Sequence, residues 1–205
     1  MRVVVSLLVT SASLAVAQMP GVPVLQNAWA TPGLAAAADF SGGAGASVWA
    51  VAFSWSPGAT QISGGGGMQS RTGLSSRGVY GVRVALPLAQ FMNGNAGLSG
   101  FAGIGGGAAT ALDSSAVTSL IPVGVALGYR HAMGARGISI YASPSYQWAS
   151  TRAGSTSGVR VGLGVDLGLA PSFGLTGGLQ FGQARTSGGS GTSYVLGASY
   201  ALGRR

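Results

Sequence analysis

The sequence contains no cysteine, no lysine and no glutamate, and charge of either sign is sparse. Without cysteine the chain has neither disulfides nor thiolate metal sites, so cysteine chemistry says nothing about its compartment. Charged residues make up 7% of the chain, against about 25% in ordinary globular proteins. So few charges could hardly cover a surface in contact with water, which argues against an ordinary soluble domain.

Long apolar runs are also missing beyond the N-terminus, where no stretch approaches the roughly 20 residues that a membrane-spanning helix needs. Glycine, by contrast, is abundant at 38 of 205 residues, and the mean hydropathy is +0.43. A chain too apolar for water and too interrupted for membrane helices fits the other fold that satisfies its backbone within lipid. That fold is the closed β-barrel.

The stretch VRVGLGVDLGLAP, residues 159–171, shows the pattern that such a barrel requires. Aliphatic side chains occupy every second position, and glycine, arginine and aspartate occupy the positions between them. Successive side chains of a β-strand point to opposite faces, so this strand has one aliphatic face and one small or polar face. The pattern predicts that the aliphatic face meets lipid and the other face lines the lumen.

The same alternation recurs along the chain and predicts an all-β fold, a closed antiparallel up-and-down transmembrane barrel of about ten strands. Eight strands are the alternative if the first hairpin is miscounted. The expected strands span residues 34–42, 46–55, 59–69, 78–88, 96–109, 117–131, 137–149, 158–170, 173–184 and 192–203.

The N-terminus resembles an export signal. Arg2 precedes an apolar stretch, and small residues at Ala15 and Ala17 favour cleavage before Gln18. The alternatives are cleavage at a second small-x-small site, at Ala28 and Ala30, and an uncleaved helical anchor. We therefore expect a signal peptide over 1–17, a periplasmic extension over 18–33 and the barrel over 34–205. The extension could act as a tail, a plug strand or a docking peptide.

Bulky aromatic residues gather near the two ends of the expected strands, on the lipid-facing parity. Amphipathic rings settle at the level of the lipid headgroups, so two girdles are the arrangement expected of a transmembrane barrel. The predicted outer girdle contains Trp49, Tyr80, Tyr146, Trp148, Phe181 and Tyr194, and the periplasmic girdle contains Trp55, Tyr129, Phe173 and Tyr200.

Charged residues on the opposite parity are predicted to line the lumen. They are Asp39, Arg83, Arg130, Arg160 and Asp166. A buried charge needs water or a partner, so we expect Arg130 and Asp166 to pair across the interior. A closed, bridged interior is the favoured interpretation, and a narrow passage for small solutes is the alternative.

The last expected strand, YVLGASYAL, resembles the C-terminal assembly signal of small outer-membrane β-barrels of Gram-negative bacteria, which are related in architecture to the OmpA and OmpX types. Gly197, Tyr200 and Leu202 stand at the matching offsets. The resemblance implies insertion by the barrel-assembly machinery into the outer membrane. Two departures are that Leu202 replaces the usual terminal aromatic residue and that Gly-Arg-Arg follows it.

Catalytic and cofactor motifs are weak in this sequence. The single histidine, His131, has no acid beside it, and the three aspartates, Asp39, Asp113 and Asp166, lack metal-ligand spacing. The glycine runs at 64–67 and 103–108 have neither the lysine of a phosphate-binding loop nor a following helix pattern. We therefore predict no catalytic, cofactor-binding or metal site.

These observations together predict a non-catalytic outer-membrane protein with a structural or surface-exposed role. The alternative is a narrow, weakly anion-favouring pore, and an outer-leaflet hydrolase is a remote third class. Expected partners are outer-membrane lipid and lipopolysaccharide, with nucleic acid excluded because clustered basic residues are missing. The arginines expected in outer loops, which could meet lipopolysaccharide phosphates, are Arg71, Arg77, Arg152 and Arg185.

Overall fold

Ten β-strands make up almost all of the computed structural model, which describes residues 25–43, 45–108, 117–133, 136–184 and 190–202. The predicted signal peptide, residues 1–17, lies outside the described residues. The strands are β1 (Gly33–Gly43), β2 (Ala46–Ser56), β3 (Gln61–Arg71), β4 (Leu74–Phe91), β5 (Ala96–Gly107), β6 (Val117–Met133), β7 (Arg136–Thr151), β8 (Gly154–Ala170), β9 (Phe173–Ala184) and β10 (Ser190–Leu202).

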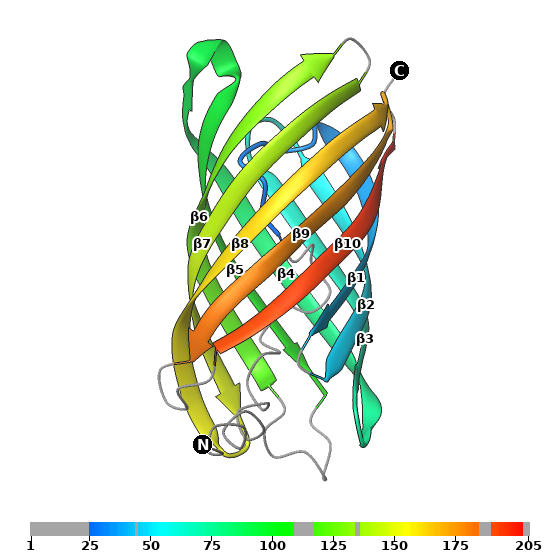
Figure 1. Ribbon diagram of the computed structural model, residues 1–205, viewed down its shortest axis with the longest axis vertical. Coiled ribbons are helices and arrows are strands. Elements are labelled where there is room, and N and C mark those ends of the chain that lie inside the picture. Colours follow the sequence, from blue (N-terminus) through cyan, green and yellow to red (C-terminus); the bar gives the residue numbers. More distant parts are fainter. Residues whose placement is uncertain (1–24, 44, 109–116, 134–135, 185–189, 203–205) are drawn as a thin grey trace, which may run out of the picture.

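The strands form a closed barrel in which each strand pairs antiparallel with its neighbours in the sequence. The first and last strands close the ring, with Leu34 of β1 opposite Leu202 of β10. Closure leaves no unpaired strand edge, so the backbone hydrogen-bonding groups of the wall are satisfied by the wall itself. The predicted ten-stranded, up-and-down architecture is confirmed, and the eight-stranded alternative is wrong (Figure 1).

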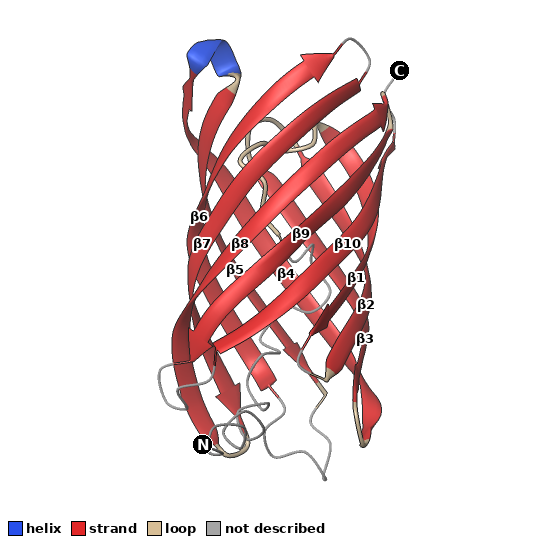
Figure 2. Cartoon of the chain, viewed as in Figure 1, coloured by secondary structure: helices blue, strands red, loops and turns tan. Residues whose placement is uncertain are grey.

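Helical structure is limited, in the part of the chain that the structure describes, to η1 (Met92–Gly94), a single turn between β4 and β5 (Figure 2). None of the described helical segments is long and apolar enough to cross a membrane.

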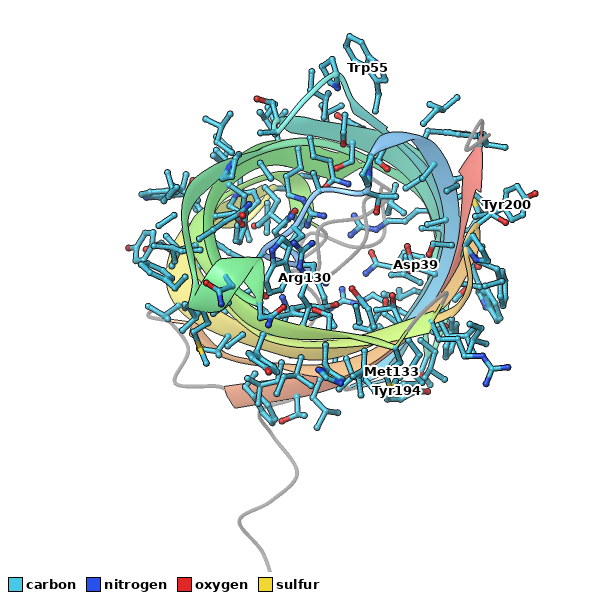
Figure 3. All side chains as sticks on the ribbon, turned by 90° about the horizontal axis from the view of Figure 1, so that it is seen from above. Asp39, Trp55, Arg130, Met133, Tyr194 and Tyr200 are labelled. Carbon is cyan, nitrogen blue, oxygen red and sulfur yellow. The ribbon has the colours of Figure 1, made fainter. Side chains whose placement is uncertain are left out.

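Side chains alternate between the two faces of the wall as the sequence pattern predicts. On β2, Trp49 is 66% exposed on the outside, whereas its neighbour Val48 is 4% exposed on the inside. Seen along its axis, the barrel places the labelled Trp55 and Tyr200 outside the wall and Asp39 and Arg130 within it (Figure 3). The exterior is thus covered by large apolar side chains, an arrangement suited to lipid.

The two ends of the barrel differ in what they carry. At one end, here called the terminal end, β1 begins and β10 ends; the other is the loop end (Figure 1). At the loop end, β3 and β4 are joined by Thr72 and Gly73, and β7 and β8 by Arg152 and Ala153. The sequence predicted longer loops at both places. That prediction is wrong because the ladders continue past the expected strand ends, and Gly73 adopts the positive φ (77°) of a tight turn.

Proline interrupts the ladder between β6 and β7 without changing its register. The pairing of β6 with β7 stops at Gly124 opposite Ser145 and resumes at Leu127 opposite Ala142, with two residues omitted from each strand. Pro144, which has no N–H to donate, lies in this gap. The register is the same on both sides of Pro144, so no β-bulge occurs there. A true irregularity occurs on β4, where the register with β5 shifts between Pro87 and Ala89.

Candidate functional site

The lumen is the candidate functional site because the polar side chains of the barrel gather there. The buried polar residues on the strands are Asp39, Ser41, Ser56, Ser63, Gln69, Arg77, Arg83, Ser99, Ser139, Ser143, Ser145, Gln147, Arg160, Gln180 and Ser193. They alternate with exposed apolar residues, so they lie on the inner face of the wall. The result is a polar interior inside an apolar shell, as in outer-membrane barrels.

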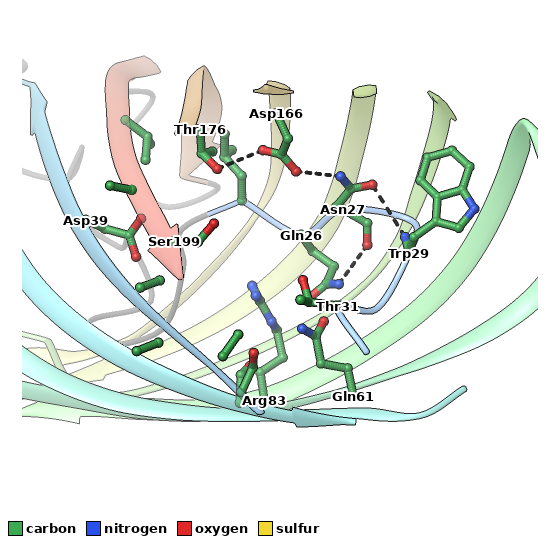
Figure 4. A pocket seen from close by; sticks show the side chains of 18 of the residues that line it. Gln26, Asn27, Trp29, Thr31, Asp39, Gln61, Arg83, Asp166, Thr176 and Ser199 are labelled. Atoms are coloured by element: carbon green, nitrogen blue, oxygen red, sulfur yellow. Dashed lines mark hydrogen bonds between the residues drawn. The ribbon is translucent and has the colours of Figure 1, made fainter. Parts of the chain in front are cut away.

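The chain before β1 lies inside this lumen. Residues 25–32 contain no regular secondary structure, and Leu25, Gln26 and Ala28 are buried by the surrounding wall (Figure 4). The sequence predicted a periplasmic extension over 18–33 and left a plug strand as one alternative. The structure places residues 25–32 within the barrel, without strand pairing, while residues 18–24 lie outside the described residues. We call residues 25–32 the lumen segment.

Glycines of the inner wall provide space for the two large apolar side chains of the lumen segment. A Cβ atom added at Gly97 of β5 would lie 3.0 Å from the Trp29 ring, and one at Gly128 of β6 would lie 2.8 Å from it. Added Cβ atoms at Gly162 of β8 and Gly178 of β9 would likewise collide with Leu25. The Leu25 and Trp29 side chains therefore fit against the wall because these four wall residues have no side chain.

Asn27 provides the polar attachment between the lumen segment and the wall. Its side-chain amide donates to Asp166 Oδ2 on β8 over 2.5 Å and to Ser139 Oγ on β7 over 3.1 Å. Asp166 is also the acceptor for the Tyr141 hydroxyl at 3.1 Å and for the Thr176 hydroxyl at 2.8 Å. Asp166 thus lies among three donors, one of which comes from the lumen segment (Figure 4).

The predicted pair between Arg130 and Asp166 does not form. Arg130 lies at the terminal end, where its Nε donates to the Gly94 carbonyl over 3.0 Å and its guanidinium lies 5.0 Å from the centre of the Trp29 ring. Asp166 is occupied by Asn27, Tyr141 and Thr176. Instead of contacting each other, the two charged residues both contact the lumen segment. The Arg130 guanidinium lies over the Trp29 ring, and the Asp166 carboxylate accepts a hydrogen bond from Asn27.

The other predicted lumen charges also lie on the inner face. Asp39, Arg83 and Arg160 are all buried. Asp39 and Arg83 border a cavity of about 130 Å³ between the lumen segment and the wall, which Asp166 also lines (Figure 4). The Arg83 guanidinium lies 5.9 Å from the centre of the Phe101 ring. A second cavity, of about 160 Å³, is lined by the segment and by Arg130 and Ser99.

Two buried residues of the lumen, Tyr141 and Arg77, were not predicted from the sequence to lie there. Tyr141 is buried and contacts Asp166, and its position follows from the inward alternation of Ser139 and Ser143 on the same strand. Arg77 was expected in an outer loop. It lies inside the barrel, donating to Gln69 Oε1 over 2.6 Å, because β4 begins at Leu74 and the parity of Arg83 extends back to it.

The aromatic residues expected in girdles lie on the outer face near the two ends of the wall. Trp55, Tyr129, Phe173 and Tyr200 are exposed near the terminal end. Toward the loop end, the exposed members are Trp49, Tyr80, Trp148, Phe181 and Tyr194. Tyr146 is half-buried, because its ring packs 4.6 Å from that of Trp148 and its hydroxyl donates to Ser157. Their placement at the lipid interfaces stays a prediction.

The residues of the expected assembly signal lie on β10, on both faces of the wall. Tyr200 and Leu202 are exposed on the exterior. Gly197 faces inward opposite Asp39, and an added Cβ atom there would collide with Asp39 Oδ1. Its lack of a side chain gives the Asp39 carboxylate its place in the lumen. The Gly-Arg-Arg that follows Leu202 lies outside the described residues.

Residues considered for catalysis or metal binding are dispersed. His131 is exposed on β6 opposite Ile138, near the terminal end. Within the described residues, no group of three or more histidines, cysteines or acids could hold a metal ion. Asp113 and Arg185 lie outside the described residues. The glycine runs at 64–67 and 103–107 are strand residues of β3 and β5.

Comparisons with known proteins give only distant likenesses. No protein-family model matches this chain, and no curated protein sequence does. Among solved structures, Neisserial surface protein A shows 12% identity over 82% of this chain and 94% of its own, with a TM-score of 0.40. Omp33 of Acinetobacter baumannii shows 10% identity over 86% of this chain and 100% of its own (TM-score 0.38). The KdgM porin shows 8% identity over 82% of this chain and 99% of its own (TM-score 0.39). The barrel fold is therefore assigned from the strand pairing of this chain itself.

Proposed function

We propose that the protein is a non-catalytic outer-membrane barrel whose lumen is closed by its own N-terminal segment, with a structural or surface-exposed role. The single observation that carries this proposal is the lumen segment itself, seated on four wall glycines and attached through Asn27 to Asp166. A barrel of about ten strands has a narrow interior. The segment occupies part of this interior, with cavities of about 130 and 160 Å³ beside it, which favours closure.

The exterior supports placement in the outer membrane of a Gram-negative bacterium. Bulky apolar side chains cover the wall along its length, from Trp55 near the terminal end to Trp49 near the loop end. Barrels with an even number of strands keep both termini in the periplasm, so the terminal end is the periplasmic end of this proposal. Export by the predicted signal peptide over 1–17 belongs to the same proposal.

The loop end would then face the cell exterior and lipopolysaccharide. Arg71 and Arg152 stand at its tight hairpins, where guanidinium groups are suited to phosphate. The hairpins carry few residues beyond the wall, so they offer a small surface for binding other molecules. Insertion by the barrel-assembly machinery, implied by the resemblance of β10, completes the proposed set of partners.

A pore for small solutes is the second candidate, favoured by the cavities that remain beside the lumen segment. In addition to the two cavities beside Trp29 and Arg83, a hollow of about 370 Å³ opens at the terminal end, lined by Thr31, Asp166 and Ser199. Polar linings on both sides of the segment would suit hydrated solutes.

A vesicle-swelling assay separates the two candidates. The protein without residues 1–17 is refolded into lipid vesicles, and heat-modifiable gel migration confirms that the barrel has formed. We expect swelling in small sugars at the rate of protein-free vesicles, because the segment blocks the lumen. Swelling close to the rate produced by an open general porin would replace the closed barrel with the pore. Hydrolysis of phospholipid or peptide that disappears in His131→Ala would favour the hydrolase instead.

A further inference from the structure

We infer that the lumen segment is a displaceable gate, and that its departure opens an ion-conducting passage through the barrel. This inference rests on the proposed closed barrel and adds an activity to it. The segment forms no strand, unlike the wall, and the inner wall behind it carries buried polar side chains, with buried apolar ones such as Val48 and Phe101 between them.

The attachment of the segment is weak compared with that of the strands. Each strand is paired on both sides by a long ladder, whereas residues 25–32 form no strand within the described part of the chain. Asn27 hydrogen-bonds to the wall through its side chain, to Asp166 and Ser139, and through its carbonyl, to Ser99. Regions with few backbone ladders open at free energies below that of global unfolding. The segment can therefore leave while the barrel stays folded.

Two polar atoms of the segment would gain partners outside the lumen. Gln26 Oε1 and Trp29 Nε1 are buried and have no hydrogen-bond partner among the described residues. A polar group without a partner is unfavourable in a buried site and is satisfied in water. The cavities of about 130 and 160 Å³ beside these residues also show that the segment fills the lumen incompletely. Both features lower the free energy needed for displacement.

The wall behind the segment is suited to ions. Arg77, Arg83 and Arg160 are buried charges of one sign on the inner face, and Asp39 and Asp166 are the opposing charges. The inner surface thus carries more positive than negative side chains, which favours anions. The opened lumen of a barrel of this size is narrow, so small inorganic anions such as chloride are the class of solute expected.

Cross-linking of the segment provides the test, because the chain has no cysteine of its own. Asn27→Cys and Ser139→Cys are combined, since these side chains are 3.1 Å apart at their polar atoms. A short, reducible bifunctional thiol reagent joins the two cysteines, and mass spectrometry measures the yield. Single-channel currents are then recorded in planar bilayers in potassium chloride, before and after reduction.

The expected result is a silent cross-linked protein that shows discrete, anion-favouring openings after reduction. Silence in both states would overturn the gate and leave the closed barrel intact. Equal openings in both states would show that the segment does not block the lumen, which would overturn the gate and the proposed closed barrel together. The two failures are therefore distinguishable in one experiment.

A substitution at a wall glycine beside Trp29 tests the same gate without cysteine chemistry. In Gly97→Val the new side chain occupies the space of the Trp29 ring, which supplies the three nearest atoms at 3.0–3.1 Å. Overpacking of this kind should raise the fraction of time that the channel is open, measured in single-channel recordings, roughly 5- to 150-fold. Gly168→Ala, whose Cβ would meet only the backbone of Gly137 at 3.4 Å or more, is the matched control and should leave it unchanged. An open fraction equal in the two variants would contradict the gate.

Discussion

Leu163→Arg should destabilise the folded barrel by about 2–4 kcal/mol in a lipid bilayer, because it places a guanidinium on the lipid face near mid-depth. Leu163 lies near the centre of β8, pairs with Ala142 and Leu179, and is exposed on the exterior. Denaturant unfolding of the protein in vesicles, followed by tryptophan fluorescence, measures the loss of free energy. Leu163 tests the environment of the exterior directly, since its side chain is exposed on the outer face of the wall.

Depth along the same strand provides the control. Val159 also faces outward, but it is opposite Tyr146, one of the aromatic residues toward the loop end. Near the lipid interface an arginine costs only about 0–1 kcal/mol, because the side chain reaches the headgroups. Val159→Arg should therefore be much milder than Leu163→Arg. Equal free energies of unfolding for the two variants would mean that the exterior does not lie in hydrocarbon.

Gly197→Val should destabilise the barrel by about 1–3 kcal/mol, the usual effect of overpacking. The new Cβ would collide with Asp39 Oδ1 on the adjacent strand and would lie 3.4 Å from the Ala38 carbonyl. Refolding without the assembly machinery is the informative assay. A defect there must come from packing in the lumen, whereas loss of an assembly signal alone would leave refolding in vitro unchanged.

Removal of the Asp39 carboxylate should restore much of the stability that Gly197→Val loses. Asp39→Ala deletes the carboxylate that the new side chain strikes, so the double variant should lose less free energy than the sum of the two single variants. Gly177→Val on the outer face of β9 is the control, because its Cβ would meet only Leu196 at 3.9 Å. Strict additivity between positions 39 and 197 would contradict the contact that the structure shows.

The strands could be predicted from the sequence because their pattern is local. Alternation between lipid-facing and lumen-facing residues has a period of two, so a run such as residues 159–169 specifies both the strand and its faces. The ends were less certain, as at β4, which begins at Leu74 where the sequence suggested residue 78. A two-residue turn lets a ladder continue through serine and threonine residues that resemble a loop.

The lumen could be predicted only in part. Parity placed Asp39, Arg83, Arg160 and Asp166 on the inner face, because each lies between apolar neighbours within a strand. The lumen segment has no period, and its seat depends on glycines from four strands that meet only in the closed barrel. The predicted pair of Arg130 and Asp166 was wrong for that reason, since nothing in the sequence indicates that Asn27 and Trp29 lie between them.

The central claim, that residues 25–32 lie inside the barrel, is tested most directly by a spin label at Ala30. This residue borders the cavity of about 160 Å³, so a label has room without displacing the segment. In vesicles, a segment inside the barrel should give the broad spectrum of an immobilised label and little broadening by an aqueous nickel reagent. The narrow spectrum of a freely moving label, fully accessible to nickel, would show that the segment is a tail outside the lumen and would contradict the account.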